Sequence, residues 1–167
     1  KKGAILFMVN HPNGLIDPLI VAVNNPRVQH FLVRAASFKK PLIKRFLESL
    51  NLMPIYRMRD GVKQLGNNKD VFDKCFTLLN NQKALMIFPE GSHDKRRTVR
   101  TLSKGFSRIV FGALEQNPAL QIHIIPVGLT YQNPSFYPSN VCLHYGTPIL
   151  ANDFYKPLII NSEIKRL

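Results

Sequence analysis

Residues 9–19 read Val-Asn-His-Pro-Asn-Gly-Leu-Ile-Asp-Pro-Leu, and the expected fold is built outward from this stretch. The apolar run at 4–9 is typical of a strand buried on both faces, and it leads His11 onto a turn of Pro, Asn and Gly. Asp17 and Pro18 indicate a helix start, with Asp17 as the N-cap and Pro18 at the first helical position. The pattern predicts a histidine held at the end of a strand.

Asp17 follows His11 by six residues, so the two side chains are expected to meet across this turn. Such a carboxylate fixes the tautomer of the imidazole and supports the positive charge that the ring gains on accepting a proton. The alternative is that Asp17 only caps the helix and that His11 is an ordinary loop residue. This stretch by itself leaves both interpretations open.

Further along the chain, short apolar runs alternate with amphipathic stretches. Strands are expected at 29–35, 53–57, 84–88, 122–129 and 141–145, and helices at 17–23, 38–50, 68–80 and 104–117. This alternation predicts an α/β fold: a single domain, residues 1–167, with a central mixed, partly parallel β-sheet flanked by helices. Because the sequence does not begin with Met and ends without a turn signal, a segment of a longer chain is an open alternative.

The charge balance is strongly basic, with 23 Lys and Arg against 10 Asp and Glu and a net charge of +13. This surplus predicts an anionic partner: nucleic acid, an acidic membrane surface or a phosphorylated substrate. The 38–50 stretch joins an apolar stripe to four cations, which suits a helix packed on a sheet or one lying on anionic lipid. No apolar run approaches the roughly 20 residues that cross a bilayer, and a flanking membrane segment is left open.

Cys75 and Cys142 lie in apolar contexts without metal-ligand spacing, so both are expected to be reduced core residues in a cytosolic setting. The histidines also lack ligand spacing with cysteines or carboxylates. The sequence therefore predicts no bound metal and no cofactor.

Polar groups follow other expected strands as well. Arg57 ends one strand, and the strand at 84–88 leads into Glu90 and Gly91. Ligands of open α/β sheets bind beyond the carboxyl ends of the strands, so these groups and His11 are expected to share one cleft. Gly91 would allow close backbone approach and an amide directed at a developing oxyanion. Taken singly, Glu90 is more typical of a structural acid paired with an arginine, and Arg57 of a solvated charge.

Four short blocks occur in order along the chain: Asn-His-Pro-Asn at 10–13 with Asp17, Pro-Ile-Tyr-Arg at 54–57, Phe-Pro-Glu-Gly-Ser at 88–92, and Ile-Pro-Val at 125–127. Together they resemble the motif blocks of the glycerophospholipid acyltransferases, the family of 1-acylglycerol-3-phosphate acyltransferases. The resemblance covers about residues 4–149. The first and third blocks are its specific part.

The resemblance implies transfer of a fatty acyl group from a thioester, acyl-CoA or acyl carrier protein, to a hydroxyl of a lysophospholipid or glycerol phosphate. In this scheme His11 is the catalytic base and Asp17 orients it. Pro126 would shape the acyl-donor cleft, and the acceptor and its phosphate would be bound by Arg57, Glu90, Gly91, Ser92, Arg97 and Arg100. The implied partners are the lysolipid acceptor, the acyl donor and an anionic membrane surface, with the protein on the cytoplasmic face of the membrane.

The chain departs from the family pattern in two places. Five residues separate His11 from Asp17, where the family's usual spacing is four, which indicates a turn one residue longer. The third block usually continues Gly-Thr-Arg-Ser, whereas this chain has Gly-Ser-His-Asp at 91–94. Nearby arginines at 96, 97 and 100 are candidates to replace the missing cation. An acceptor without phosphate, such as a lyso-aminolipid, is the alternative.

Two other classes of protein remain as alternatives. A basic nucleic-acid-binding module is favoured by the net charge and by the cations at 95–108, but no helix-turn-helix, zinc-finger or RNP-like pattern is present. Any binding of nucleic acid is therefore expected to act through charge alone, without sequence specificity. A hydrolase would use the same His–Asp pair with water, and no Gly-x-Ser-x-Gly elbow is present to supply a serine nucleophile.

Overall fold

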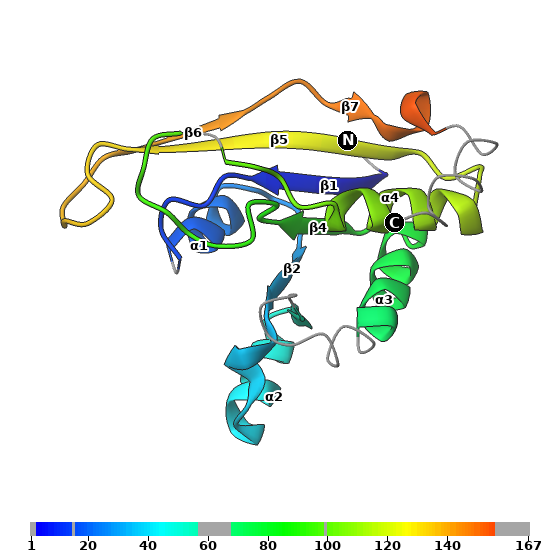
Figure 1. Cartoon of the computed structure of the whole chain (residues 1–167), viewed down its shortest axis with the longest axis horizontal. Coiled ribbons are helices and arrows are strands. Elements are labelled where there is room, and N and C mark those ends of the chain that lie inside the picture. The colour runs from blue at the N-terminus through cyan, green and yellow to red at the C-terminus, as the bar shows by residue number, and fades with distance from the viewer. Residues whose placement is uncertain (1–2, 15, 57–67, 99, 156–167) are drawn as a thin grey trace.

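The computed structural model describes residues 3–14, 16–56, 68–98 and 100–155. Within these ranges a seven-stranded sheet has the order β3-β2-β4-β1-β5-β6, with β7 paired to β5 (Figure 1). The strands β1 to β5 run parallel, and β6 and β7 are antiparallel to β5. Their bounds are β1 (Ala4–Val9), β2 (Gln29–Arg34), β3 (Leu52–Ile55), β4 (Ala84–Ile87), β5 (Ile122–Tyr131), β6 (Val141–Tyr145) and β7 (Ile149–Leu150). The predicted α/β fold with a mixed, partly parallel sheet is confirmed.

The apolar run that precedes His11 is the strand β1, which lies between β4 and β5 in the sheet. Its side chains alternate between two apolar clusters, one on each face of the sheet. Leu6 belongs to the first cluster, whereas Phe7 and Val9 belong to the second. Burial on both faces explains why the run is continuously apolar rather than alternating.

Helices cover both faces of the sheet. α3 (Asn68–Asn80) and α4 (Gly105–Gln116) supply residues such as Cys75 and Ile109 to the cluster that contains Leu6. α1 (Ile16–Val23) places Val21 in the opposite cluster. Because β1 to β5 are parallel, the segments that follow them, including those that carry His11 and Glu90, emerge at one edge of the sheet.

α2 (Pro41–Ser49) is the exception to this layered packing. It follows a short 3-10 helix, η1 (Ala35–Phe38), and stands away from the sheet in Figure 1. None of its residues is buried, and the exposed fractions of Leu42 and Phe46 are 83% and 62%. The apolar stripe predicted at 38–50 is therefore largely uncovered, although α2 contacts the edge strand β3 and Leu47 is half-buried. Over the described ranges, the chain forms no helix with both the length and the apolar character that spanning a bilayer requires.

Two expectations from the sequence are wrong. Cys142 is exposed because β6 lies at the edge of the sheet, whereas Cys75 is buried as predicted. Asp17 is not the N-cap of α1, which already includes Ile16. The side-chain oxygen of Asn13 instead accepts a hydrogen bond from the amide of Ile16 at 3.4 Å. The carboxylate of Asp17 is thereby left for other partners.

Candidate active site

His11 and Asp17 form a hydrogen-bonded pair just beyond the carboxyl end of β1. The Nδ1 atom of His11 lies 2.8 Å from Oδ2 of Asp17. The imidazole side chain is 13% exposed and the carboxylate is fully buried. The prediction that these side chains meet across the turn, with five residues between them, is confirmed.

The carboxylate of Asp17 receives two further hydrogen bonds. The amide of Asn13 donates to Oδ2 at 2.7 Å, and the hydroxyl of Tyr131 donates to Oδ1 at 2.6 Å. An ionised carboxylate only accepts hydrogen bonds, so the Nδ1 atom of His11 carries a proton in this arrangement. The Nε2 atom of His11 is then the nitrogen with a free lone pair. The pair is arranged to accept a proton at Nε2 and to stabilise the resulting charge.

Neighbouring strands fix the position of His11. The side chain of Asn10 donates to the carbonyl of Leu129 at 2.9 Å and accepts from the amide of Leu129 at 2.7 Å, which ties the end of β1 to β5. The imidazole of His11 stacks on the ring of Phe88, with centroids 4.0 Å apart, at the end of β4. Contacts with two strands thus restrict the orientation of the ring.

The Phe-Pro-Glu-Gly-Ser block forms a tight turn after β4. Gly91 has a φ of 72°, a conformation that favours glycine. Its amide donates to the carbonyl of Phe88 at 3.0 Å and is therefore used within the turn. The expectation that this amide is directed at an oxyanion is wrong. The side chain of Arg100 binds Glu90 and also contacts the hydroxyl and the carbonyl of Ser92. Glu90 is thus the arginine-paired acid that one interpretation of the sequence favoured.

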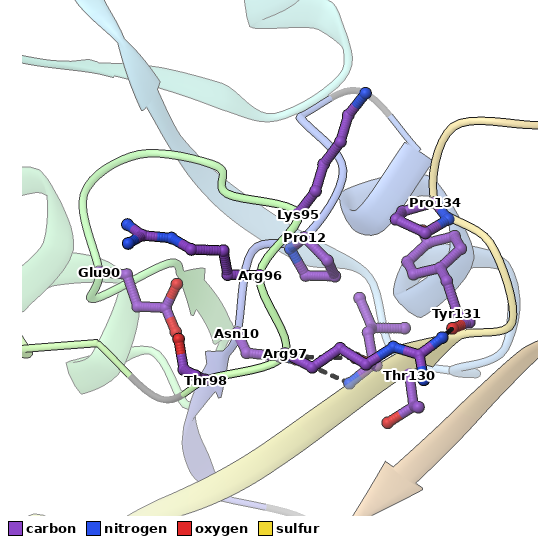
Figure 2. A pocket seen from close by; sticks show the side chains of 11 residues that line it. Asn10, Pro12, Glu90, Lys95, Arg96, Arg97, Thr98, Thr130, Tyr131 and Pro134 are labelled. Carbon is purple, nitrogen blue, oxygen red and sulfur yellow. Dashed lines mark hydrogen bonds between the residues drawn. The ribbon is translucent and has the colours of Figure 1, made fainter.

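A cavity of about 190 Å³ opens next to Tyr131, the residue that binds Asp17 (Figure 2), and neither His11 nor Asp17 is among its lining residues. Both sequence neighbours of His11 line it, as do Tyr131 and a group of cations. Its lining residues are Asn10, Pro12, Glu90, Lys95, Arg96, Arg97, Thr98, Leu129, Thr130, Tyr131 and Pro134. The cavity therefore brings positive charge close to the proposed base.

The cations around this cavity differ in their hydrogen-bond and ion-pair partners. Arg97 donates to the carbonyls of Tyr131 and Gln132 at 3.3 and 2.9 Å, and Figure 2 shows its side chain extended towards Tyr131. Arg96 pairs with Asp94 at 2.7 Å, and its side-chain hydrogen bond lowers the pKa of that carboxyl to about 2. Lys95 extends away from the arginines in Figure 2. Among the hydrogen bonds and ion pairs of the described residues, Arg97 has no carboxylate partner.

Other predicted site residues lie elsewhere. Arg57 falls outside the described residues. Pro126 is exposed on β5, paired in register with Met8, and it is not among the residues that line the cavity. Among the described residues, no group of three or more His, Cys, Asp or Glu side chains is placed to hold a metal ion.

Tyr131 is the contact of this site that the sequence did not reveal. Every second residue of a strand lies on the same face, so Val127, Leu129 and Tyr131 share one face of β5. In the parallel pairing of β1 with β5, Val127 lies beside Val9. Once that register is known, Tyr131 is directed to the turn after β1; the sequence alone does not give the register.

The fold and this site define an α/β protein with a hydrogen-bonded His–Asp pair beyond the carboxyl end of its central parallel strands. The sequence model of the family described as Acyltransferase matches residues 1–130, and the chain belongs to this family. The family assignment made from the four motif blocks is confirmed.

Known proteins extend this finding. The chain is 28% identical over 89 residues to glycerol-3-phosphate O-acyltransferase 2 of Saccharomyces cerevisiae, covering 53% of this chain and 12% of the yeast protein. It is 26% identical over 102 residues to glycerol-3-phosphate O-acyltransferase 1 of the same yeast, covering 58% of this chain and 13% of that protein. The chain thus spans only a small part of these relatives.

A solved structure shares the fold. The 1-acyl-sn-glycerophosphate acyltransferase PlsC of Thermotoga maritima superposes with a TM-score of 0.58 at 14% identity, covering 99% of this chain and 63% of that one. At this identity the likeness establishes the architecture alone.

Proposed function

We propose that the protein transfers a fatty acyl group from a thioester, acyl-CoA or acyl carrier protein, to a hydroxyl of glycerol phosphate or a lysophospholipid. The observation that carries this proposal is the 2.8 Å contact between His11 and the fully buried Asp17. Family membership and the names of the yeast relatives support the same chemistry.

In the proposed reaction, Nε2 of His11 accepts the proton of the acceptor hydroxyl as its oxygen attacks the thioester carbonyl carbon. A carbon–oxygen bond forms, and the carbonyl electrons move onto the oxygen of a tetrahedral intermediate. When this intermediate collapses, the carbon–sulfur bond breaks and the leaving thiolate takes the proton from His11. Asp17 holds the ring and stabilises its transient positive charge. No metal and no bound cofactor enters this scheme.

The acceptor's phosphate is proposed to lie against the cations of the cavity. Arg97 is the strongest candidate because its described side-chain partners are backbone carbonyls, which leave its charge uncompensated. Arg100 is already bound to Glu90, so it is better suited to holding the turn at Glu90 to Ser92 in place. An acceptor without phosphate, such as a lyso-aminolipid, would have no use for this charge.

A membrane location is proposed for the same protein. The exposed stripe of α2, which includes Leu42 and Phe46, is accompanied by Lys39, Lys40, Lys44 and Arg45. This combination suits a helix that lies in the interface of an anionic, cytoplasmic membrane surface. α2 follows the carboxyl end of β2, and His11 follows that of the parallel strand β1. Docking through α2 would therefore bring the edge of the sheet that carries the active site towards lipid.

The test of the proposed base is His11→Ala, assayed with labelled palmitoyl-CoA and a panel of glycerol 3-phosphate, lysophosphatidate and a lyso-aminolipid. We expect kcat to fall by roughly 10²–10⁴ because general-base catalysis is lost, while the acceptor's KM changes little. Asp17→Asn should give a smaller loss, since it disturbs the ring rather than removing it. Mass spectrometry of the product identifies the acceptor, and circular dichroism shows whether each variant is folded. Full activity of folded His11→Ala would exclude this mechanism.

The nucleic-acid alternative has a separate readout. Charge alone should give weak binding that does not depend on sequence and that falls steeply with salt. Tight binding of one defined sequence at physiological salt would favour the alternative instead.

A further inference from the structure

We propose that Tyr131 is a positioning residue of the His–Asp pair: its hydroxyl fixes the carboxylate of Asp17 and limits the negative charge which that carboxylate offers to His11. This inference rests on the proposed acyl transfer and adds a third, chain-distant member to its machinery. Tyr131 does not touch the reacting atoms in this scheme; it acts through Asp17.

The geometry gives the two oxygens of Asp17 different tasks. Oδ2 accepts from the ring of His11 and from the amide of Asn13. Oδ1 accepts from the hydroxyl of Tyr131 at 2.6 Å. No other described hydrogen bond reaches Oδ1. Loss of this hydroxyl would leave a fully buried carboxylate oxygen without its donor, and the carboxylate would be free to rotate or to draw in water.

The hydroxyl of Tyr131 is suited to donate at every working pH. The ring is only 7% exposed, and burial, followed by the hydrogen bond to Asp17, raises the pKa of Tyr131 well above its ordinary value. The phenol therefore stays protonated and does not compete with His11 as a base. The hydrogen bond from Tyr131 draws negative charge towards Oδ1, so the carboxylate attracts the protonated ring of His11 less strongly. The bond therefore affects the basicity of His11 as well as the orientation of Asp17.

Tyr131 reaches Asp17 from a strand that is distant in the sequence but adjacent to β1 in the sheet. The two residues are 114 positions apart, and Tyr131 closes β5, the strand to which the side chain of Asn10 is also tied. The same residue lines the cavity shown in Figure 2. The packing of α1, which carries Asp17, against β5, which carries Tyr131, thus sets the distance between donor and carboxylate, and the hydroxyl binds the carboxylate directly.

The first test is Tyr131→Phe, which keeps the ring and removes only the hydroxyl. We expect kcat to fall about 3- to 30-fold, the scale of one buried hydrogen bond, with little change in the acceptor's KM. The pH below which kcat/KM declines should also rise, because a carboxylate without its donor attracts a proton on the imidazole more strongly. Besides Asp17, the titratable group that faces the imidazole of His11 is His93, whose ring lies edge-on to it with centroids 5.9 Å apart, and Tyr131→Phe leaves His93 unchanged. Tyr137→Phe is the matched control, since its side chain is 98% exposed, and it should behave as the wild type.

A second variant guards against a folding defect. Incorporation of 3-fluorotyrosine at position 131 keeps both ring and hydroxyl but makes the phenol a stronger donor. The acidic limb of the profile should then move to lower pH, opposite to Tyr131→Phe. Wild-type kcat and an unmoved pH profile in folded Tyr131→Phe would overturn the proposal, as would a shift in the same direction for both variants. If His11→Ala is inactive while both Tyr131 variants match the wild type, only this inference fails and the proposed function stands.

Discussion

Arg100 grips one oxygen of Glu90 with two nitrogens: Nε lies 3.0 Å and a terminal nitrogen 2.5 Å from the same Oε2 atom. The side chain of Glu90 is 6% exposed and that of Arg100 is 20% exposed. The pair is therefore largely removed from water, directly after the strand that supports the ring of His11.

Arg100→Ala should destabilise the protein because it leaves the buried carboxylate of Glu90 without its partner. The expected loss in free energy of unfolding is about 3 kcal/mol, the low end of the range for broken buried ion pairs. The double variant Glu90→Gln with Arg100→Ala should recover part of this loss, since no charge then remains buried. Urea denaturation measures both. Arg96→Ala is the control: its ion pair with Asp94 is exposed, and no measurable change is expected. Equal losses in Arg96→Ala and Arg100→Ala would contradict this account.

Arg97→Gln should weaken binding of a phosphate-bearing acceptor. Glutamine keeps a donor for the backbone carbonyls of Tyr131 and Gln132 but removes the charge at the cavity. We expect the KM for glycerol 3-phosphate to rise about tenfold with little change in kcat, because this contact exists before and during the reaction. Arg108→Gln makes the same charge change at an exposed position of α4 and should leave KM unaltered. An unchanged KM in both variants would show that Arg97 does not bind the phosphate of the acceptor.

Removal of the apolar stripe of α2 should release the protein from membranes. In co-sedimentation with phosphatidylcholine vesicles containing phosphatidylserine, binding should increase with the anionic fraction and fall with salt, at about 1 kcal/mol for each nearby cation. Leu42→Ser combined with Phe46→Ser should bind markedly less, whereas Phe136→Ser, at an exposed site outside α2, should bind normally. Equal binding to neutral vesicles at high salt would point to hydrophobic insertion without an electrostatic part. Undiminished binding by the α2 variant would rule out α2 as the docking surface.

Gly112 allows α4 to lie close to α3. A Cβ atom at this position would come within 2.5 Å of the ring of Phe76. Gly112→Ala should therefore lower the free energy of unfolding by about 1–3 kcal/mol, the cost of overpacking, despite the better helix propensity of alanine. Gly105→Ala in the same helix meets nothing closer than 3.9 Å and should be tolerated. Adding Phe76→Leu should restore part of the stability of Gly112→Ala; without any such recovery, the clash is not the cause.

The sequence predicted the sheet well because its strands are continuous apolar runs that are buried on both sides, as at β1 and β4. It also predicted the meeting of His11 and Asp17, which depends on one local turn. It did not predict that Tyr131 reaches Asp17, because that contact depends on the register of two strands distant in the chain. The sequence did not predict the exposure of Cys142 for a related reason. The residues of an apolar strand do not show whether that strand lies at the centre or at the edge of a sheet. Contacts within one local turn can be predicted from the sequence, whereas contacts between segments distant in the chain cannot.

The position of β1 also has a consequence for the order in which the chain is made. β1 leaves the ribosome well before its two neighbours in the sheet, which begin only at Ala84 and Ile122. β1 has two open edges until β4 has been made and one open edge until β5 has been made, and contacts of such long range form slowly. The turn that carries His11 is synthesised before β5, but the hydrogen bond from Tyr131 to Asp17 can form only when β5 is complete. The apolar strand β1 is thus exposed to aggregation until β5 has been made, and the dependence of the nascent chain on chaperones should be concentrated in the interval before Tyr131 is added.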